Sequence, residues 1–117
     1  MNDLQEELFL VKKIKVYPNY GAGPVWVHDE KGILIAVDLP AEARGDEELT
    51  KLSYDISLMY ESLFLNNEKT FEYIGFSCKE DEVILKSKIK RLHEILVEKV
   101  SDKYEIEVPS WVFEKWE

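Results

Sequence analysis

The two histidines are the first residues to consider for chemistry, because histidine is the usual general base near neutral pH. His28 is followed by Asp29, but His28 ends a predicted strand, and neighbouring strand residues point to opposite faces of a sheet. A His28–Asp29 dyad is therefore not expected. His93 lies beside a predicted core position of a helix and is expected at the surface. We predict no catalytic residues and expect the chain not to be an enzyme.

No metal, cofactor or phosphate site is predicted either. A zinc site needs three or four converging ligands, and the chain offers one cysteine and two distant histidines. Residues 21–23 are Gly-Ala-Gly, but a phosphate-binding loop opens a helix, whereas a strand is predicted to follow here. Cys78 precedes a predicted helix, which would lower the pKa of its thiol, yet the acidic residues 80–82 oppose that shift. We expect Cys78 to be a partly buried structural residue.

Carboxylates form two clusters, residues 46–48 and residues 80–82, each at the expected start of a helix. Anions at this position complement the helix dipole by about 0.3–1 kcal/mol each, which is a sufficient structural reason for both clusters. They also form an acidic surface. The acidic strand over residues 104–108 and the aromatic C-terminal tail enlarge this surface. Aromatic residues dominate binding hot spots, although those of the tail also suit a core. The candidate partner-binding residues are Asp46, Glu47, Glu48, Glu80, Asp81, Glu82, Glu105, Glu107, Trp111 and Trp116.

A β-hairpin over residues 24–38 is the element expected to organise the fold. Residues 29–32 fit a type I turn in which Gly32 takes the left-handed conformation. Residues 33–37 are continuously apolar, which predicts a strand covered on both faces near the middle of a sheet. In the preceding run, Trp26 is expected to need a hydrogen-bond acceptor for its indole N–H if it is buried.

The remaining elements follow from hydrophobic periodicity and from capping residues. The lysines within residues 11–17 suit an edge strand, with Ile14 and Val16 facing inward. Asp46 is a good N-cap for the first long helix. The predicted elements are a short helix over 3–10, strands over 11–17, 70–77 and 104–108, helices over 46–65 and 80–100, and a helical turn or short strand in the tail.

These elements predict one α+β domain over residues 1–117. We expect a mainly antiparallel sheet of about five strands, in the chain order β-β-β-α-β-α-β, with two amphipathic helices packed on it. The N-terminal helix or the aromatic tail is expected to cover the second face of the sheet. With 45% hydrophobic residues, the chain is able to form a core without disulfides.

The location and the partner classes are predicted from charge and composition. A single cysteine, an acidic N-terminus unlike a signal peptide and no apolar run of about 18 residues predict a cytoplasmic protein that binds no membrane. The net charge of −9 opposes binding of nucleic acid or anionic lipid. Acidic clusters instead favour a positively charged partner and speed its encounter. Simple solubility is the alternative explanation of this charge.

A small, acidic chain with aromatic residues among its acids and no catalytic motif resembles the immunity proteins of bacterial toxin systems, including contact-dependent growth inhibition. The resemblance covers size, charge and lack of motif over the whole chain. It implies a monomer or weak homodimer that binds a cognate toxin domain, often a basic nuclease, and occludes its active site by mimicking phosphates. Two alternatives stay open: a small enzyme that uses carboxylates alone, and a homo-oligomeric structural protein whose aromatic tail forms the subunit interface.

Overall fold

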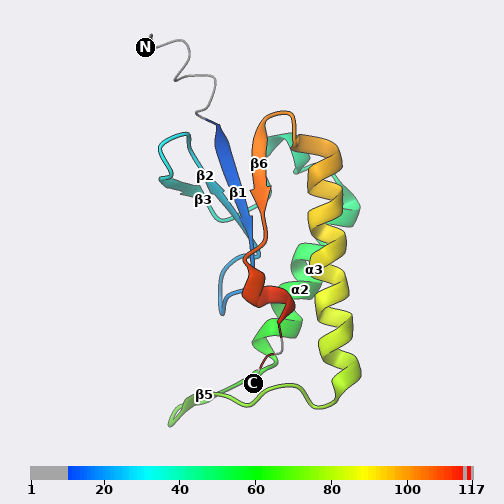
Figure 1. The fold of residues 1–117 in the computed structure, drawn as a ribbon. Helices are drawn as coiled ribbons and strands as arrows, with labels where there is room; N and C mark the ends of the chain where they lie inside the picture. The colour runs from blue at the N-terminus through cyan, green and yellow to red at the C-terminus, as the bar shows by residue number, and fades with distance from the viewer. Residues whose placement is uncertain (1–10, 115, 117) are drawn as a thin grey trace.

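The computed structural model describes residues 11–114 and residue 116, and its fold belongs to the predicted α+β class (Figure 1). The helix predicted over residues 3–10 lies outside the described residues. The main sheet has four strands in the order β3-β2-β1-β6, and two further strands, β4 and β5, form a separate hairpin. The elements are β1 (Lys12–Val16), β2 (Val25–His28), β3 (Leu34–Ala36), η1 (Ala41–Ala43), α2 (Glu47–Glu61), β4 (Phe64–Asn66), β5 (Phe71–Tyr73), α3 (Lys79–Val100), β6 (Tyr104–Glu107) and η2 (Ser110–Phe113).

The main sheet is mixed, whereas a mainly antiparallel sheet of about five strands was expected. β1 pairs antiparallel with β2 and parallel with β6, so the edge position predicted for β1 is wrong. The physical reason is that the lysines of β1 face a neighbouring strand that carries glutamates. Ile14 and Val16 alternate with these lysines and are fully buried, as predicted.

The β2–β3 hairpin forms with the expected turn. Gly32 has a φ of +83°, and its N–H donates to the Asp29 carbonyl. The position predicted for the second strand is nevertheless wrong, because β3 is an outer strand of the sheet. Its apolar run is largely exposed, because the helices pack mainly on the other strands, and within β3 only Ala36 packs against the core.

Helix α2 begins as predicted, with the Asp46 carboxylate accepting a hydrogen bond of 2.8 Å from the Leu49 N–H. It ends at Glu61, earlier than expected, because the chain turns into β4. The Asn67 side chain accepts hydrogen bonds from two backbone N–H groups and closes the β4–β5 turn. The internal strand predicted over residues 70–77 is wrong, because only Phe71–Tyr73 is a strand and it is exposed.

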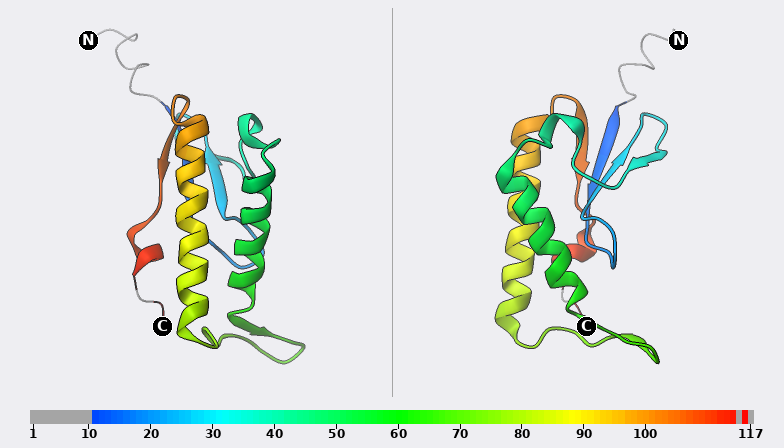
Figure 2. Two further views of the ribbon diagram at one scale, coloured as in Figure 1. Left: turned by 90° about the vertical axis from the view of Figure 1, so that its right-hand side faces the viewer. Right: turned by 180° about the vertical axis from the view of Figure 1, so that it is seen from behind.

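The core lies between the inner face of the main sheet and the apolar stripes of α2 and α3, which cover that face (Figure 2). Trp26 finds the acceptor that its indole requires, donating to the Tyr17 carbonyl at 3.0 Å. The tail adopts the helical turn η2, one of its two predicted conformations, and buries Val112 in the core. Over residues 11–114 and 116, neither helix is both long and apolar enough to cross a membrane.

Candidate protein-binding surface

The candidate carboxylates lie at two opposite ends of the helical layer. α2 and α3 run antiparallel, so the start of α2 lies beside the end of α3 (Figure 2). Residues 46–48 are at this proximal end, and residues 80–82 are at the other, distal end. No single surface therefore contains both acidic clusters.

Most of the proximal charge serves the fold. Asp46 caps α2 and pairs with Lys99 at 3.0 Å. The backbone hydrogen bond from Leu49 lowers the pKa of the Asp46 carboxyl, and Lys99 lowers it further. Glu48 pairs with Arg91 at 3.0 Å, while the exposed Glu47 makes no ion pair within the described ranges. The proximal cluster thus stabilises α2 and ties it to α3.

Replacement of Asp46 by Asn is expected to lower the melting temperature at neutral pH, because Asn keeps a cap acceptor but loses the ion pair with Lys99. Since the folded-state pKa of Asp46 is lowered, its ionised form stabilises the fold above the usual carboxyl pKa of about 4. That contribution is lost as the pH falls through the lower folded-state pKa. Thermal unfolding followed by circular dichroism should therefore show the two melting curves converging in acid.

Glu47→Gln is the matched control for this experiment, because Glu47 lies next to Asp46 and has no ion pair among the described residues. Its melting temperature at neutral pH should fall less than that of Asp46→Asn, because Glu47→Gln loses only the favourable interaction with the helix dipole, about 0.3–1 kcal/mol. A difference between Asp46→Asn and wild type that stays constant from neutral to acid pH would contradict the role assigned to Asp46.

The candidate carboxylates of β6 lie on a third part of the surface, the outer face of the main sheet. Glu107 lies 3.6 Å from the Lys13 ammonium and 3.9 Å from that of Lys15. Glu105 lines a shallow cavity of about 330 Å³ with these lysines and His28. Charges of both signs alternate here, so this face is not a continuous acidic surface.

His28 and Asp29 form no dyad in the structure. The Asp29 carboxylate accepts hydrogen bonds from the Lys31 and Ile33 N–H groups and so holds the turn. His28 Nδ1 is buried and has no hydrogen-bond partner in the described part of the chain. Within the same ranges, no group of three or more His, Cys, Asp and Glu side chains converges as a metal site requires.

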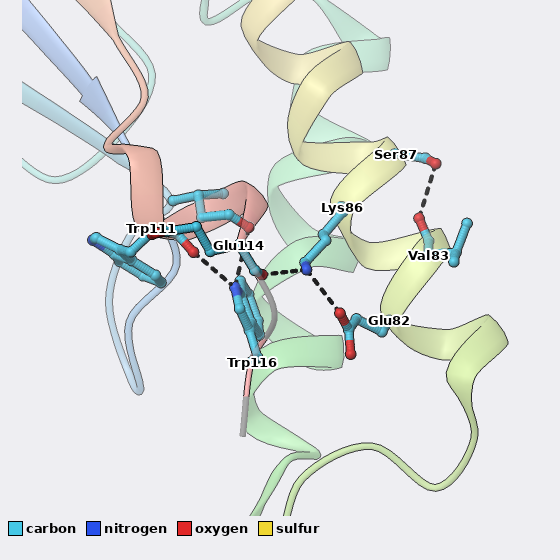
Figure 3. Close-up of polar contacts among 8 residues, drawn as sticks. Glu82, Val83, Lys86, Ser87, Trp111, Glu114 and Trp116 are labelled. Carbon is cyan, nitrogen blue, oxygen red and sulfur yellow. Dashed lines mark hydrogen bonds and ion pairs between the residues drawn. The ribbon is translucent and has the colours of Figure 1, made fainter.

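The distal carboxylates differ among themselves in their contacts. Glu82 pairs with Lys86 at 2.7 Å, and the Lys86 ammonium also donates to the Glu114 carbonyl (Figure 3). Glu80 and Asp81 make no ion pair with any residue of 11–114 or 116. The start of α3 therefore presents carboxylates whose charge no described neighbour neutralises.

Trp116 and Trp111 have different environments. The Trp116 ring packs against Tyr60, Phe76 and Trp111, with centroid distances of 5.7–5.9 Å. Its indole N–H donates to the Trp111 and Val112 carbonyls at 3.1 Å, and Lys86 lies 5.6 Å from the ring centroid (Figure 3). Trp116 is thus an anchor that joins the tail to both helices, whereas Trp111 is exposed.

The β4–β5 hairpin adds an exposed apolar surface that sequence reasoning missed. It projects past the end of α2, and residues 74–78 connect it to the start of α3 (Figure 1). The polar turn between two short apolar runs is the signal that predicts such a hairpin. Its exposed apolar side chains, with the residue that follows β5, are Leu65, Phe71, Tyr73 and Ile74. We call residues 64–82, which comprise this hairpin, the next segment and the start of α3, the distal surface.

A cavity of about 500 Å³ lies within the distal surface, and Tyr73, Cys78, Glu82 and Trp116 contribute to its walls. Partial burial raises the pKa of the Tyr73 hydroxyl, and the Glu82 carboxylate raises it further. Aromatic rings and a carboxylate therefore meet in one recess. Such a combination attracts cations, because both the faces of aromatic rings and carboxylates are negative. Here the Lys86 ammonium already meets the Glu82 carboxylate and the Trp116 ring.

Cys78 is exposed, so its predicted partial burial is wrong. The residue precedes α3 at a point where the chain has left the core. A backbone hydrogen bond from Asp81 lowers the pKa of the thiol, but partial desolvation and the carboxylates of Asp81 and Glu80 outweigh it and raise the pKa. The sign of this shift agrees with the effect expected from the acidic residues 80–82.

Comparisons with protein-family models, with curated proteins and with solved structures found no match to this chain.

Proposed function

We propose that this chain is a non-enzymatic binding protein whose distal surface recognises a positively charged protein. The observation that supports this most is the recess in which Tyr73 of the β4–β5 hairpin meets Glu82, at a helix start where Glu80 and Asp81 have no ion pair with a described residue. Exposed apolar patches with polar rims mark protein–protein interfaces. The nearby unneutralised carboxylates select the charge of the partner.

The charge of the distal surface favours a basic partner. Residues 64–82 hold five carboxylates and two lysines, a net charge of −3. Complementary charge speeds the encounter, and buried aromatic anchors then hold the complex. A basic residue of the partner is expected to meet Glu80 and Asp81, because Lys86 already pairs with Glu82 and lies over the Trp116 ring.

The resemblance to immunity proteins supplies the class of partner that we propose, a cognate bacterial toxin domain of the basic nuclease type. A nuclease binds the phosphates of its substrate with clustered lysines and arginines. The distal carboxylates would occupy the place of those phosphates and keep nucleic acid out of the active site. The chain would act in the cytoplasm, where the nucleic acid is exposed to the toxin.

The test is to measure binding between the purified chain and the toxin-like C-terminal domain encoded next to its gene. We expect a one-to-one complex whose association rate falls steeply as NaCl rises from about 0.1 M to about 1 M, because the Debye length shrinks from about 10 Å to about 3 Å. Co-expression of the chain should also restore growth to cells that produce the toxin domain. The absence of such a gene, of a complex or of protection would contradict the proposal.

Neutralisation of Glu80 and Asp81 tests whether the distal surface is responsible. The variant carrying Glu80→Gln and Asp81→Gln should associate several-fold more slowly at low salt. The matched control carries Glu94→Gln and Glu98→Gln, which remove the same charge from exposed positions further along α3. Equal rates for the two variants would exclude residues 80 and 81 as the contact.

A further inference from the structure

The β4–β5 hairpin carries exposed apolar side chains of the distal surface, yet it has little of its own to hold it in place. Each of its strands has three residues, and the pair forms a sheet separate from the main sheet. An isolated two-stranded hairpin is only marginally stable in water. At its base, the N–H groups of Ile74 and Gly75 donate to the Leu63 carbonyl. The part of the hairpin near its turn therefore depends on contacts from elsewhere in the chain.

Tyr20, in the loop that joins β1 to β2 (residues 17–24), supplies such contacts. Its hydroxyl accepts a hydrogen bond of 2.9 Å from the side-chain amide of Asn66. Its ring makes T-shaped contacts with the rings of Phe71 and Phe64, at centroid distances of 4.8 Å and 5.2 Å. Asn66 and Phe71 are paired residues of β4 and β5. One side chain from a distant part of the sequence thus holds both strands of the hairpin.

The loop between β1 and β2 is itself fixed to α2 and to the main sheet. It hangs below the sheet, towards the end of the molecule that holds the hairpin (Figure 1). The Ser57 hydroxyl of α2 donates to the Gly23 carbonyl at 3.3 Å, and the Glu61 carboxylate accepts a hydrogen bond of 3.2 Å from the Gly21 N–H. A Cβ atom at Gly23 would lie 2.9 Å from the indole nitrogen of Trp26, so the loop packs directly on β2. A loop anchored in this way is able to fix the hairpin relative to the body of the protein.

We propose that Tyr20 is a positioning residue of the distal surface, which holds the β4–β5 hairpin in the orientation that binds the partner. The contacts continue from Phe64 to Tyr73, whose rings lie 5.5 Å apart, and Tyr73 lines the recess beside Glu82. A surface that is already ordered loses less conformational freedom on binding, which raises its affinity. The inference rests on the proposed function and adds to it a residue outside the distal surface on which binding depends.

Amide hydrogen exchange tests the positioning role without a partner. In Tyr20→Ala, the hydrogen-bonded amides of residues 64–73 should exchange about tenfold faster than in the wild type, because the hairpin opens more often. The amides of α3 should exchange as before, which shows that the fold is intact. Tyr20→Phe keeps the ring and loses the hydrogen bond with Asn66, so its exchange should lie between the two. Tyr54→Ala is the matched control, since it removes an exposed tyrosine of α2 and should leave the hairpin amides unchanged.

Binding kinetics with the toxin-like domain test the consequence for recognition. If about a tenth of the Tyr20→Ala molecules hold the hairpin in the binding orientation, the affinity falls about tenfold. This loss should be the same at about 0.1 M and about 1 M NaCl, because the substitution alters no charge. The loss caused by Glu80→Gln and Asp81→Gln should instead shrink in high salt. Tyr20→Phe should recover most of the affinity, because it restores the ring.

Unchanged exchange of residues 64–73 in Tyr20→Ala would overturn the positioning role, as would an increase that extends equally to α3. Faster exchange of the hairpin combined with wild-type affinity would also overturn it, because binding would then not need the fixed orientation. Absence of any complex with the wild type would instead refute the proposed function, and the exchange of residues 64–73 alone would then decide whether Tyr20 holds the hairpin.

Discussion

Reversing the charge of Glu80 and Asp81 with Glu80→Lys and Asp81→Lys is expected to slow association with a basic toxin domain by about tenfold to a hundredfold at low salt. The two substitutions change the charge at the start of α3 by four units, at positions that no described cation screens. The expected loss is in the association rate, because exposed charges act mainly on encounter. Stopped-flow or biosensor kinetics measure both rates directly.

The control for this reversal carries Glu94→Lys and Glu98→Lys, which change the same charge on the same helix at exposed positions away from its start. It should slow association much less, and the difference between the two variants should close in high salt. Equal slowing by both variants would mean that net charge matters and the distal surface does not. Lysines at a helix start also cost about 0.3–1 kcal/mol each, so thermal unfolding must show that both variants are folded at the assay temperature.

The elements predicted correctly are those whose signals are local. Apolar residues at three- and four-residue spacing predict both long helices. Asp46 caps α2, as its residue type predicts. The turn at Gly32 likewise depends on neighbours within four residues. A single chain segment carries each of these signals, so the sequence is sufficient to find them.

The order of the strands in the sheet depends on pairing between segments far apart in the chain, and a local sequence pattern does not identify those pairing partners. Lys12 pairs with Tyr104, and no feature of residues 11–17 reveals a parallel neighbour that follows two helices. The apolar run of residues 33–37 indicates a strand, but it does not reveal that this strand lies exposed at the edge of the sheet. Phe64 continues the apolar spacing of α2, so the sequence pattern predicts that the helix extends through it. In the structure Phe64 instead begins β4, because the turn at Asn67 pairs β4 with β5 in a hairpin.

The sequence predicts the acidic clusters, but it does not show that they lie on different parts of the surface. Asp46 and Glu80 are equivalent in sequence, since each belongs to an acidic cluster where a helix begins. They differ because Lys99 reaches Asp46 from the end of α3, whereas no described cation reaches Glu80. Neutralisation by a residue far along the chain is a property of the fold, so only the structure separates carboxylates that hold helices together from those free to meet a partner.

Trp116→Ala is expected to destabilise the chain by about 3 kcal/mol, near the lower end of the range for truncating large aromatic residues in cores. The substitution removes the ring contacts with Tyr60 and Phe76, and it takes away the ring beside the Lys86 ammonium. It also leaves the Val112 carbonyl without the indole donor. Urea unfolding at neutral pH measures the loss as a change in the free energy of unfolding.

Phe113→Ala is the matched control for Trp116→Ala, because Phe113 is an exposed aromatic residue of the same tail and should cost less than about 1 kcal/mol. Equal stability of both variants would show that the packing of Trp116 contributes little to folding. Because Trp116 contacts Phe76 and lines the same recess as Tyr73, its removal should also speed dissociation of a bound partner. The association rate should change little, since no charge is altered. Trp116→Ala and the reversal of Glu80 and Asp81 should therefore act on opposite rates of one complex, a result expected only if the anchor and the carboxylates belong to the same binding surface.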